Sequence, residues 1–359
     1  GMSTGPRDGA RRGRLTGPRG LAQSRAVTSR TAALRAALPP ALAEPLDAWV
    51  EHLTAGRDLS EHTVRAYTGD VVSLLDHLVR RGGTHVTAAL VDLDSHGVLA
   101  EHRGHPDAQG SADALLAGWI ETARLLGDVA GDWVVAMPGP FDYAAGIGRF
   151  RDVGKFDALD GVDVGSALRA ALGADVRFVN DADAYGLGEW FAGAGEGTSR
   201  AIVLTLGTGL GSAFVADGAP VVDGETVPLD GEIHFEALRG LPIEDVVSRR
   251  ALMAAGLVAT GVERDVHELA IAARAGEAAA GAVLVAGFSA VGEVIRPWLD
   301  RFDAEVLVIG GSMARSWDIV EPAVRVGLGD WGGRLERAAL GDTAPLLGAA
   351  WFGRDSRMV

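Results

Sequence analysis

An Asn-Asp pair and a glycine-rich turn are the residues whose types and spacing best suit chemistry on a phosphate group. Asn180 and Asp181 directly follow one short apolar run, and Gly207, Thr208 and Gly209 follow another. A carboxylate can take the proton of an attacking hydroxyl, and backbone amides without side chains in the way can contact phosphate oxygens. The pair and the turn therefore predict two halves of a phosphate-transfer site.

Each half is expected to stand at the carboxyl end of a strand. Residues 176–179 are β-branched or aromatic apart from one Arg and are followed at once by a helical pattern, which predicts a strand that leads into a helix. Residues 201–206 and 212–216 predict two strands joined by the glycine turn. Ligands of open α/β sheets bind at the carboxyl ends of strands. Two plainer interpretations stay open: Asp181 or Asp183 only caps the helix, and the turn is an ordinary hairpin.

The alternation of strands and helices continues along the chain and predicts its fold class. The expected elements are a helix over 112–126, a strand over 133–137, helices over 243–257 and 266–296, a strand over 305–309, and helices from 319 and over 345–352. This order predicts an α/β architecture with more than one sheet. With 359 residues, 48% of them hydrophobic, the chain is long enough for two domains.

The composition excludes several classes of site. The chain has no cysteine, which excludes disulfide frameworks, thiolate metal sites and thiol nucleophiles. The longest uncharged windows, 201–216 and 278–292, are shorter than the ~20 residues of a membrane-spanning helix and contain glycines, so they predict buried elements. No signal-peptide pattern stands at the start, and we expect a cytoplasmic protein without membrane contact.

Charge is distributed unevenly along the chain. The net charge is −15, yet residues 1–40 carry eight Arg and one Asp, so the remaining body is strongly acidic. An acidic body repels nucleic acid, and any such contact would have to run through residues 1–82. Residues 1–40 are rich in Gly, Ser, Pro and Arg, which predicts a disordered basic tail. A solvated linker is the plainer interpretation, and a nucleic-acid-binding arm is the alternative.

Residues 41–82 predict a short helical segment, with apolar residues at helical spacing and Ser60 as an N-cap. This segment resembles the N-terminal core-binding segment of Xer-type tyrosine recombinases, which would imply a DNA contact. Residues 62–65 and 77–80 spell the HxxR pattern of that family's catalytic domain. Both lie inside the helical segment, where neighbours on a solvated face explain them better.

A second glycine turn follows this segment. Gly82, Gly83 and Thr84 lead into an apolar strand over 86–92, much as the turn at 207–209 leads into 212–216. Two such hairpins facing one another would hold a phosphate chain between them. Residues 74–81 before the second turn look helical, so this copy is expected to lack its leading strand.

From Gly82 onward the chain resembles the ROK family of sugar kinases and sugar-responsive regulators, within the actin-like ATPase superfamily. The resemblance rests on six motifs in the family's order: PGPFD, NDAD, TLGTGLGSAF, DGEI, LVIGGSMA and LLGAAWFG. It implies two actin-like (ribonuclease H-like) α/β lobes with an interlobe cleft. The expected lobes cover 83–180 and 181–335, and residues 336–359 would form a C-terminal helix returning to the first lobe.

The resemblance also implies roles for individual residues. Asp181 would be the general base toward a sugar hydroxyl, and Asn180 would hold a neighbouring hydroxyl. The expected sugar contacts are completed by Glu232, His234 and Glu244. The expected phosphate and nucleotide contacts are Gly82, Gly83, Thr84, Gly207, Thr208, Gly209, Gly310 and Gly311. An ordinary strand end at Gly310 and a solvated acidic loop around Glu232 are the plainer alternatives. The implied cofactors are ATP and Mg²⁺, and the implied assembly is a homo-oligomer such as a dimer.

Three departures from the family pattern qualify these expectations. The family's GExGH reads GEIH here and is one residue short, so His234 is either a sugar ligand or a surface imidazole. The cysteine-rich zinc motif is replaced by LRGLPIEDVVS, so no zinc is expected. The first phosphate motif, DxGGT, reads RRGGT, and Arg80 stands where an Asp would orient magnesium.

The leading hypothesis is an ATP-dependent, glucokinase-like hexose kinase, or a form of one impaired by the loss of this Asp. One alternative is a non-catalytic, sugar-binding regulatory protein, and a second is a DNA-binding module built on the N-terminal helices. The abrupt change at Gly82 could also record a deletion or an incorrect gene model. The sequence leaves open which sugar is bound and which molecule donates the phosphoryl group.

Overall fold

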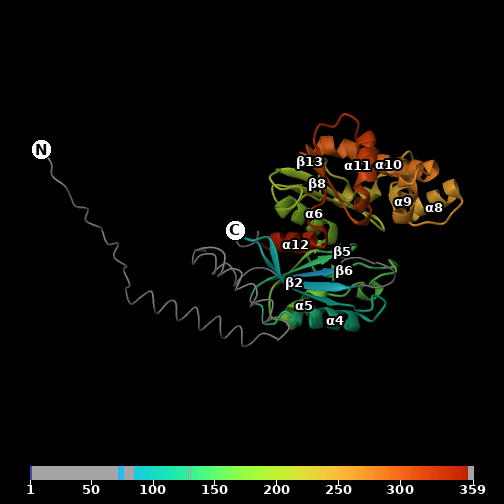
Figure 1. The fold of residues 1–359 in the computed structure, drawn as a ribbon. Helices are drawn as coiled ribbons and strands as arrows, with labels where there is room; N and C mark the ends of the chain where they lie inside the picture. Colours follow the sequence, from blue (N-terminus) through green and yellow to red (C-terminus); the bar gives the residue numbers. More distant parts are fainter. Residues whose placement is uncertain (2–71, 77–84, 128, 130, 355–359) are drawn as a thin grey trace. The chain divides into compact units, whose positions relative to one another are not determined.

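The computed structural model of the chain describes residue 1 and residues 72–76, 85–127, 129 and 131–354. The expected basic tail, most of the expected helical segment and the glycine turn of Gly82, Gly83 and Thr84 lie outside the described residues. The described part contains two five-stranded sheets, each covered by helices (Figure 1). These form the two α/β lobes that the sequence predicts.

The first sheet combines antiparallel and parallel strands in the order β3-β2-β1-β4-β7. Its strands are β1 (Val72–Asp76), β2 (Val86–Asp92), β3 (Gly97–Gly104), β4 (Trp133–Met137) and β7 (Val176–Asn180). The strands β1, β2 and β3 pair antiparallel, whereas β1, β4 and β7 run parallel. The carboxyl ends of β4 and β7 therefore meet at one edge, with Met137 opposite Asn180.

The strand β1 corrects one expectation from the sequence. We expected residues 74–81 to be helical and the first lobe to lack its leading strand. The structure instead has a strand at residues 72–76, so the expectation is wrong for this stretch. Val72 lies opposite both Leu90 of β2 and Trp133 of β4, so β1 is the middle strand of the sheet. A short apolar run does not distinguish helix from strand by its periodicity. Pairing on both sides satisfies the backbone hydrogen-bonding groups of β1. This tertiary context favours strand over helix for residues 72–76.

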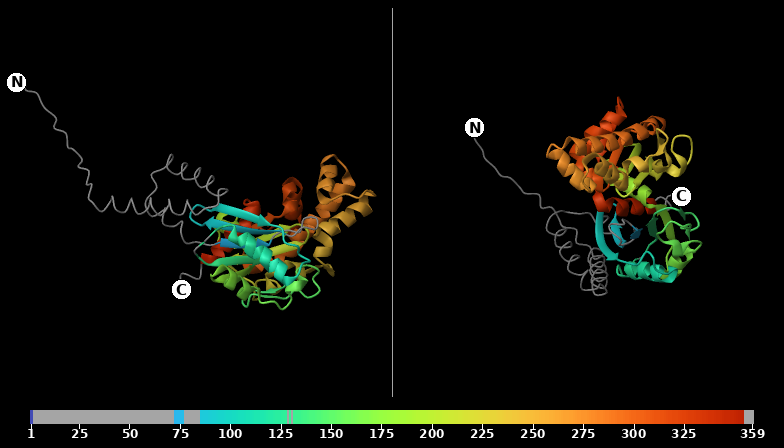
Figure 2. Two further views of the ribbon diagram at one scale, coloured as in Figure 1. Left: turned by 90° about the horizontal axis from the view of Figure 1, so that it is seen from below. Right: turned by 90° about the vertical axis from the view of Figure 1, so that its right-hand side faces the viewer.

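Two helices cover one face of the first sheet (Figure 2). The helix α4 (Ala112–Arg124) starts at Ser111, whose Oγ accepts a hydrogen bond from the Ala114 amide at 3.3 Å. The helix α5 (Val164–Leu172) starts at Asp163 and ends at Gly173, whose φ of 66° suits glycine. Apolar side chains of both helices form one cluster with alternate residues of β2, β4 and β7.

The second sheet has the order β10-β9-β8-β13-β14. Its strands are β10 (Ala219–Pro220), β9 (Leu210–Ala216), β8 (Arg200–Leu206), β13 (Val306–Gly310) and β14 (Arg334–Arg337). The hairpin of β8 and β9 is antiparallel, and β8, β13 and β14 run parallel. One face packs on α6 (Asp181–Ala192), and the other packs on α10 (Ala278–Phe302) and α11 (Trp317–Leu328).

Two helices that the sequence predicts as continuous are each divided in the structure. The expected helix over 243–257 becomes α7 (Glu244–Val247) and α8 (Arg249–Thr260), because Ser248 adopts an extended conformation and caps α8. The expected helix over 266–296 becomes α9 (Val266–Arg274) and α10, and Gly276 between them has a φ of 93°. Glycine adopts this left-handed conformation at no steric cost, which ends the helix there.

The helix α10 is the described helix that is long and apolar enough to cross a membrane by composition alone. Its apolar side chains, including Leu284, Phe288 and Ile295, lie in the core of the second lobe against β8 and β13. More than half of its most apolar window is buried there. We interpret α10 as a core helix of this lobe.

The two lobes meet through α6 and the last helix, α12 (Ala344–Arg354), which lie between the two sheets (Figure 1). These helices cross at glycines. A Cβ at Gly188 would lie 1.8 Å from the Ala344 oxygen, and one at Gly348 would lie 1.8 Å from the Ala184 oxygen. The other face of α12 packs on the first sheet, where its apolar residues contact β2 and β4. Backbone contact this close requires glycine at both positions.

A buried carboxylate fixes the far end of α6. Glu189 is fully buried and accepts hydrogen bonds from the amides of Ala194, Ala339 and Leu340 at 2.8–3.0 Å. Such charge-assisted bonds compensate for burying the charge. The end of α6 is thereby joined to the segment that leads into α12.

Candidate active site

The Asn-Asp pair stands where β7 passes into α6. Asn180 is the N-cap, and its Oδ1 accepts hydrogen bonds from the amides of Ala182 at 2.8 Å and Asp183 at 3.3 Å. Asp181 is the first helical residue, and its Oδ1 also accepts from the Ala182 amide, at 2.8 Å. The N-cap role therefore belongs to Asn180, and Asp181 shares the Ala182 amide with it.

A tyrosine that the sequence analysis did not single out holds the amide of Asn180. Asn180 Nδ2 donates to Tyr143 Oη at 2.9 Å, and Tyr143 Oη donates to the Met137 oxygen at 3.1 Å. Tyr143 directly follows β5 (Phe141–Asp142) in the PGPFD segment. The PGPFD motif drew attention to this part of the chain. Nothing in the sequence, however, indicates that Tyr143 contacts Asn180.

Several carboxyl groups share this site and influence each other's pKa. Burial raises the pKa of Asp181, which keeps a partly exposed side chain, and the Ala182 amide and the charge of Lys155 oppose this rise. Burial, together with the charges of Asp181 and Glu232, raises the pKa of Asp183 to about 8. Mutual repulsion in a poorly solvated site favours the neutral acid. Asp183 therefore holds its proton at neutral pH.

Glu232 lies beside this group in the loop between two short 3₁₀ turns. A Cβ at Gly139 would lie 3.8 Å from Glu232 Oε1 and 3.7 Å from Tyr143 Oη, which places Glu232 against the PGPFD turn. Burial raises the pKa of Glu232, the charge of His234 lowers it, and the charges of Asp230 and Asp181 raise it further. The structure thus brings Glu232 to the Asn-Asp pair.

His234 is oriented by the same loop. Its Nε2 lies 3.3 Å from Glu232 Oε2, and its ring packs on Phe235 at 4.1 Å between centroids. Ser212 Oγ on β9 donates to the Gly231 oxygen at 2.7 Å and accepts from the Ile233 amide at 2.9 Å. These bonds fix the loop to the second sheet. His234 is partly exposed, and it contacts Glu232, the carboxylate that lies at the Asn-Asp pair.

The turn of Gly207, Thr208 and Gly209 joins β8 to β9 and contacts Glu244. The Leu210 amide donates to Glu244 Oε1 at 2.9 Å, and a Cβ at Gly209 would lie 2.4 Å from that oxygen. Glu244, the first residue of α7, is therefore placed against the glycine turn. Only glycine fits at position 209 with this carboxylate in place.

The second pair of glycines lies beside this turn. Gly310 ends β13 opposite Thr205 of β8, and a Cβ at Gly207 would lie 3.9 Å from Ser312 Oγ. Gly311 has a φ of 84°, and a Cβ there would lie 2.4 Å from the Leu206 oxygen. Both turns therefore meet at the carboxyl edge of the second sheet, where α/β proteins bind ligands.

The carboxylates of the site are too few and too scattered to form a metal site by themselves among the described residues. Among the residues that the structure describes, no group of three or more His, Asp or Glu side chains is arranged to hold a metal ion. Mg²⁺ usually binds through one or two carboxylates together with the phosphates of a substrate. The segment LRGLPIEDVVS begins in the hairpin of β11 (Ala237–Leu238) and β12 (Leu241–Pro242) and continues through α7.

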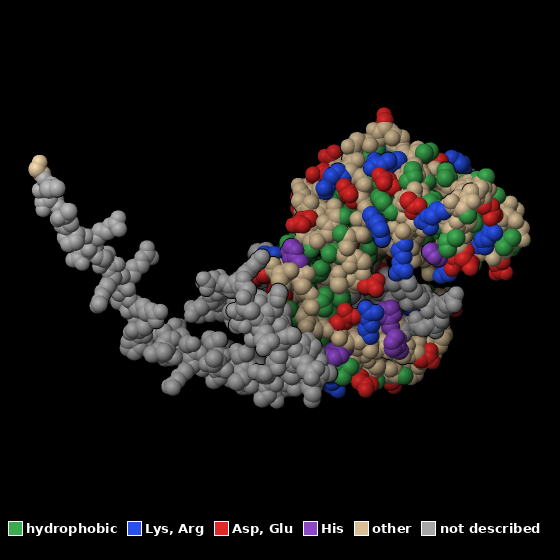
Figure 3. Space-filling model, viewed as in Figure 1, with side chains coloured by type: hydrophobic (Ala, Val, Ile, Leu, Met, Phe, Trp, Pro, Cys, Tyr) green, Lys and Arg blue, Asp and Glu red, His purple; other side chains and the backbone are tan. Residues whose placement is uncertain are grey.

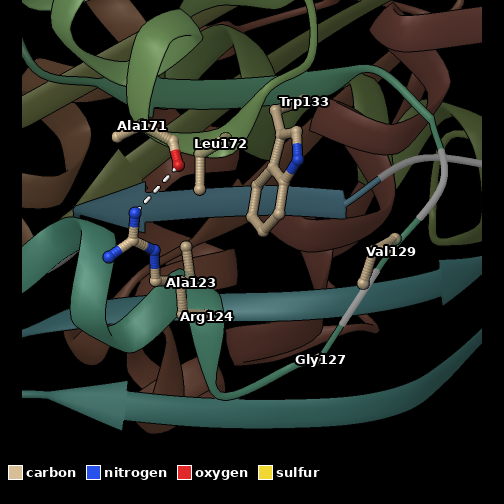
Figure 4. Close-up of a pocket in the computed structure, with 7 residues that line it drawn as sticks. All are labelled: Ala123, Arg124, Gly127, Val129, Trp133, Ala171 and Leu172. Carbon is tan, nitrogen blue, oxygen red and sulfur yellow. Dashed lines mark hydrogen bonds between the residues drawn. The ribbon is translucent and has the colours of Figure 1, made fainter.

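A separate cavity of about 290 Å³ lies at the opposite edge of the first sheet (Figure 4). Arg124 and Trp133 line it, and Trp133 begins the strand whose other end, Met137, reaches the site. Arg124 Nη2 donates to the Ala171 oxygen at 3.0 Å, near the end of α5. The guanidinium thus binds a carbonyl group at the end of α5.

On the face shown in Figure 3, acidic and basic side chains are intermixed over the described residues.

Comparison with known proteins identifies the family. The profile of the ROK family matches residues 78–356. A glucokinase of Thermotoga maritima is 27% identical over 209 residues, which cover 52% of this chain and 65% of that protein. A polyphosphate glucokinase of Mycobacterium leprae is 30% identical over 141 residues, which cover 38% of this chain and 42% of that protein.

A solved structure shows the same fold. The crystal structure of the ROK hexokinase of Thermus thermophilus superposes with a TM-score of 0.68 at 26% identity, and the match covers 80% of this chain and 99% of that one. The chain spans 34% and 65% of the lengths of the first two curated relatives that it matches. Motifs, fold and site geometry agree, and the chain belongs to the ROK family.

Proposed function

We propose that the protein transfers a phosphoryl group from ATP to a hydroxyl of a hexose. The observation that carries the proposal is the arrangement at the end of β7, where Asn180 and Asp181 lie beside Glu232 and His234. Carboxylates and amides are the groups that hold vicinal sugar hydroxyls. The two glycine turns lie together at the carboxyl edge of the second sheet, the place where α/β proteins bind phosphate-bearing ligands. Family membership and the glucokinase relatives support the same reaction.

In this mechanism Asp181 accepts the proton of the attacking hydroxyl while the hydroxyl oxygen bonds to the γ-phosphorus. Phosphoryl transfer needs mainly alignment and charge stabilisation, so one positioned carboxylate is sufficient protein chemistry. Asn180, held by Tyr143, would orient a neighbouring hydroxyl. Glu232 and His234 would hold others, and Glu244 is retained as a sugar contact although it also receives the Leu210 amide. Mg²⁺ would supply positive charge on the donor phosphates.

The loss of the usual Asp at Arg80 supports a second candidate, a ROK protein that binds sugar without turnover. Lost metal positioning typically removes orders of magnitude in rate, because the metal neutralises charge on the transferring group. Such a protein would keep the sugar contacts at Asn180, Glu232 and His234. It would bind sugar in the same place and release no ADP.

The deciding experiment measures ADP release with a panel of hexoses, for the wild type and for Asp181→Asn. We expect turnover by the wild type with at least one hexose and a loss of roughly 10²–10⁴-fold in kcat for the variant, the usual contribution of a general base. Polyphosphate is tested as a second donor by measuring the sugar phosphate itself. Sugar-dependent stabilisation without any sugar phosphate would establish the non-catalytic alternative. Equal rates for the two proteins would remove Asp181 from the mechanism.

A further inference from the structure

Tyr185 joins the helix that carries Asp181 to the second pair of glycines. It lies four residues after Asp181 in α6 and is 6% exposed. A Cβ at Gly310 would lie 2.3 Å from Tyr185 Oη and 2.8 Å from Tyr185 Cζ, so the phenol lies directly on the Gly310 backbone. The hydroxyl therefore occupies the space that a side chain at position 310 would need.

The same hydroxyl interacts with the next residue of the turn. Burial and the charge of Glu189 raise the pKa of Tyr185, and the Gly311 amide opposes this rise by donating a hydrogen bond to the hydroxyl oxygen. Gly311 also lies on the end of β8, because a Cβ there would lie 2.4 Å from the Leu206 oxygen. The turn of Gly310 and Gly311 is thus held by α6 as well as by its own sheet.

The first turn of α6 lies beside the other glycine turn. A Cβ at Gly211 would lie 3.4 Å from the Cβ of Ala182, which places the start of β9 against the beginning of the helix. The helix carries Asp181 at its first residue and Tyr185 one turn later. The sugar side and the predicted nucleotide side of the site therefore share this helix.

We propose that Tyr185 is a positioning residue that holds the turn of Gly310 and Gly311 in the shape that binds the donor nucleotide. The proposal rests on the proposed function, in which this turn contacts the nucleotide. Glycine has the greatest backbone freedom of all residues, and ordering a free turn on binding costs affinity. Tyr185 reduces this cost because its hydroxyl lies on Gly310 and receives the Gly311 amide. It acts on the donor through the turn and not by direct contact.

The first test compares Tyr185→Phe with Tyr143→Phe, since each variant loses one tyrosine hydroxyl from a different side of the site. For Tyr185→Phe we expect the KM for ATP to rise roughly two- to tenfold, the range that one net hydrogen bond gives. The KM for sugar and kcat should stay within about twofold. Tyr143→Phe should show the opposite split, because its hydroxyl holds Asn180. A lower melting temperature of Tyr185→Phe with an unchanged KM for ATP would reveal a merely structural role and overturn the proposal.

A second test measures the contact between the phenol and the turn. Gly310→Ala would place a methyl group on the phenol, so we expect the melting temperature to fall by roughly several degrees. The three heavy atoms nearest to that methyl group all belong to Tyr185, so Tyr185→Ala should relieve the clash. The double variant should then melt above the temperature obtained by adding the two single effects. Strictly additive effects would show that the phenol does not support Gly310, against the proposal.

Calorimetric binding of ADP separates this proposal from the proposed function, because binding needs no turnover. A wild type that binds ADP but phosphorylates no hexose would end the kinase assignment. An ADP affinity that is roughly two- to tenfold weaker in Tyr185→Phe, and unchanged in Tyr143→Phe, would still support the positioning role. Equal ADP affinities of Tyr185→Phe and the wild type would refute that role even in an active kinase. A wild type that binds no ADP would also refute it, including one that phosphorylates a hexose from polyphosphate.

Discussion

Asn180 Nδ2 and Tyr143 Oη are joined by a 2.9 Å hydrogen bond that links the N-cap of α6 to the PGPFD segment. Asn180 Oδ1 is meanwhile occupied by the first amides of α6. The two ends of one side-chain amide are thus held by different segments of the chain. This fixes which atom of Asn180 faces which partner, and it fixes the direction in which β7 delivers Asp181.

Tyr143→Phe tests the value of this bond. The variant keeps the ring packing against Phe141 but removes the hydroxyl that Asn180 and the Met137 oxygen share. A net hydrogen bond contributes about 0.5–1.5 kcal/mol, so we expect the KM for sugar to rise roughly two- to tenfold with a smaller change in kcat. Steady-state kinetics with varied sugar measure this. An unchanged KM would show that the tyrosine does not orient Asn180 for sugar.

Asp183→Asn tests the raised pKa of the buried carboxyl. Its pKa is about 8 in the folded protein. In the unfolded chain the same carboxyl has the usual Asp pKa of 3.8. Between these values the unfolded chain has lost the proton and the folded protein has kept it, so rising pH favours unfolding. Asparagine mimics the neutral acid and has no proton to lose. We therefore expect the variant to gain stability relative to the wild type as the pH rises from about 4 to 8.

The gain for Asp183→Asn should reach up to several kcal/mol, at about 1.4 kcal/mol per pKa unit. Urea denaturation at pH 5 and pH 8 measures it, and kcat at pH 7 should be retained. The exposed Asp223→Asn controls for the loss of one acidic side chain. Parallel stability curves for Asp183→Asn and the wild type would mean that Asp183 is ionised in the folded protein.

The sequence predicted those parts of the fold that local pattern determines. The structure contains the expected strands at 133–137 and 176–179 and the expected hairpin around Gly207. The sequence could indicate them because apolar runs bounded by turn residues are typical of strands. The strand β1 was missed, since its five residues gain their conformation from β2 and β4 on either side. The sequence did not predict the helix breaks at Ser248 and Gly276. A single serine or glycine inside a helical pattern can either stay within the helix or end it.

For the site, the sequence indicated residues and not their mutual contacts. Asn180, Asp181 and Glu232 were expected together, and the structure places them together. Tyr143 comes from the turn that directly follows β5 and carries no periodic pattern, so nothing local marks it. Glu244 was expected at the sugar, and its contact with Leu210 depends on how α7 meets the β8–β9 turn. The assigned roles of these residues stay predictions until the variants are measured.

Gly348→Ala tests the crossing of α6 and α12. A methyl group at this position would lie 1.8 Å from the Ala184 oxygen, and backbone atoms cannot yield as a flexible side chain does. Overpacking of this kind typically costs about 1–3 kcal/mol, and more where backbone must move. We expect the melting temperature to fall by at least several degrees. Scanning calorimetry measures the change.

A matched helical glycine supplies the control for Gly348→Ala. A methyl group added at Gly281 in α10 would lie 3.8 Å from the Cβ of Ala273, which is ordinary contact. Alanine favours helix over glycine by about 1 kcal/mol, so Gly281→Ala should leave the stability unchanged or raise it. Equal effects of the two substitutions would show that the helices can separate without cost.

The position of β1 in the middle of the first sheet limits where this chain can be cut. A shortened chain that begins at residue 83 would follow the boundary between the two sequence resemblances, yet it would remove the strand between β2 and β4. Both neighbours would then present unpaired edges, which favour aggregation. A chain that begins just before Val72 would keep the sheet whole. The change in sequence character at Gly82 is therefore not a joint between separable modules, because the first lobe takes its middle strand from the recombinase-like side of that boundary.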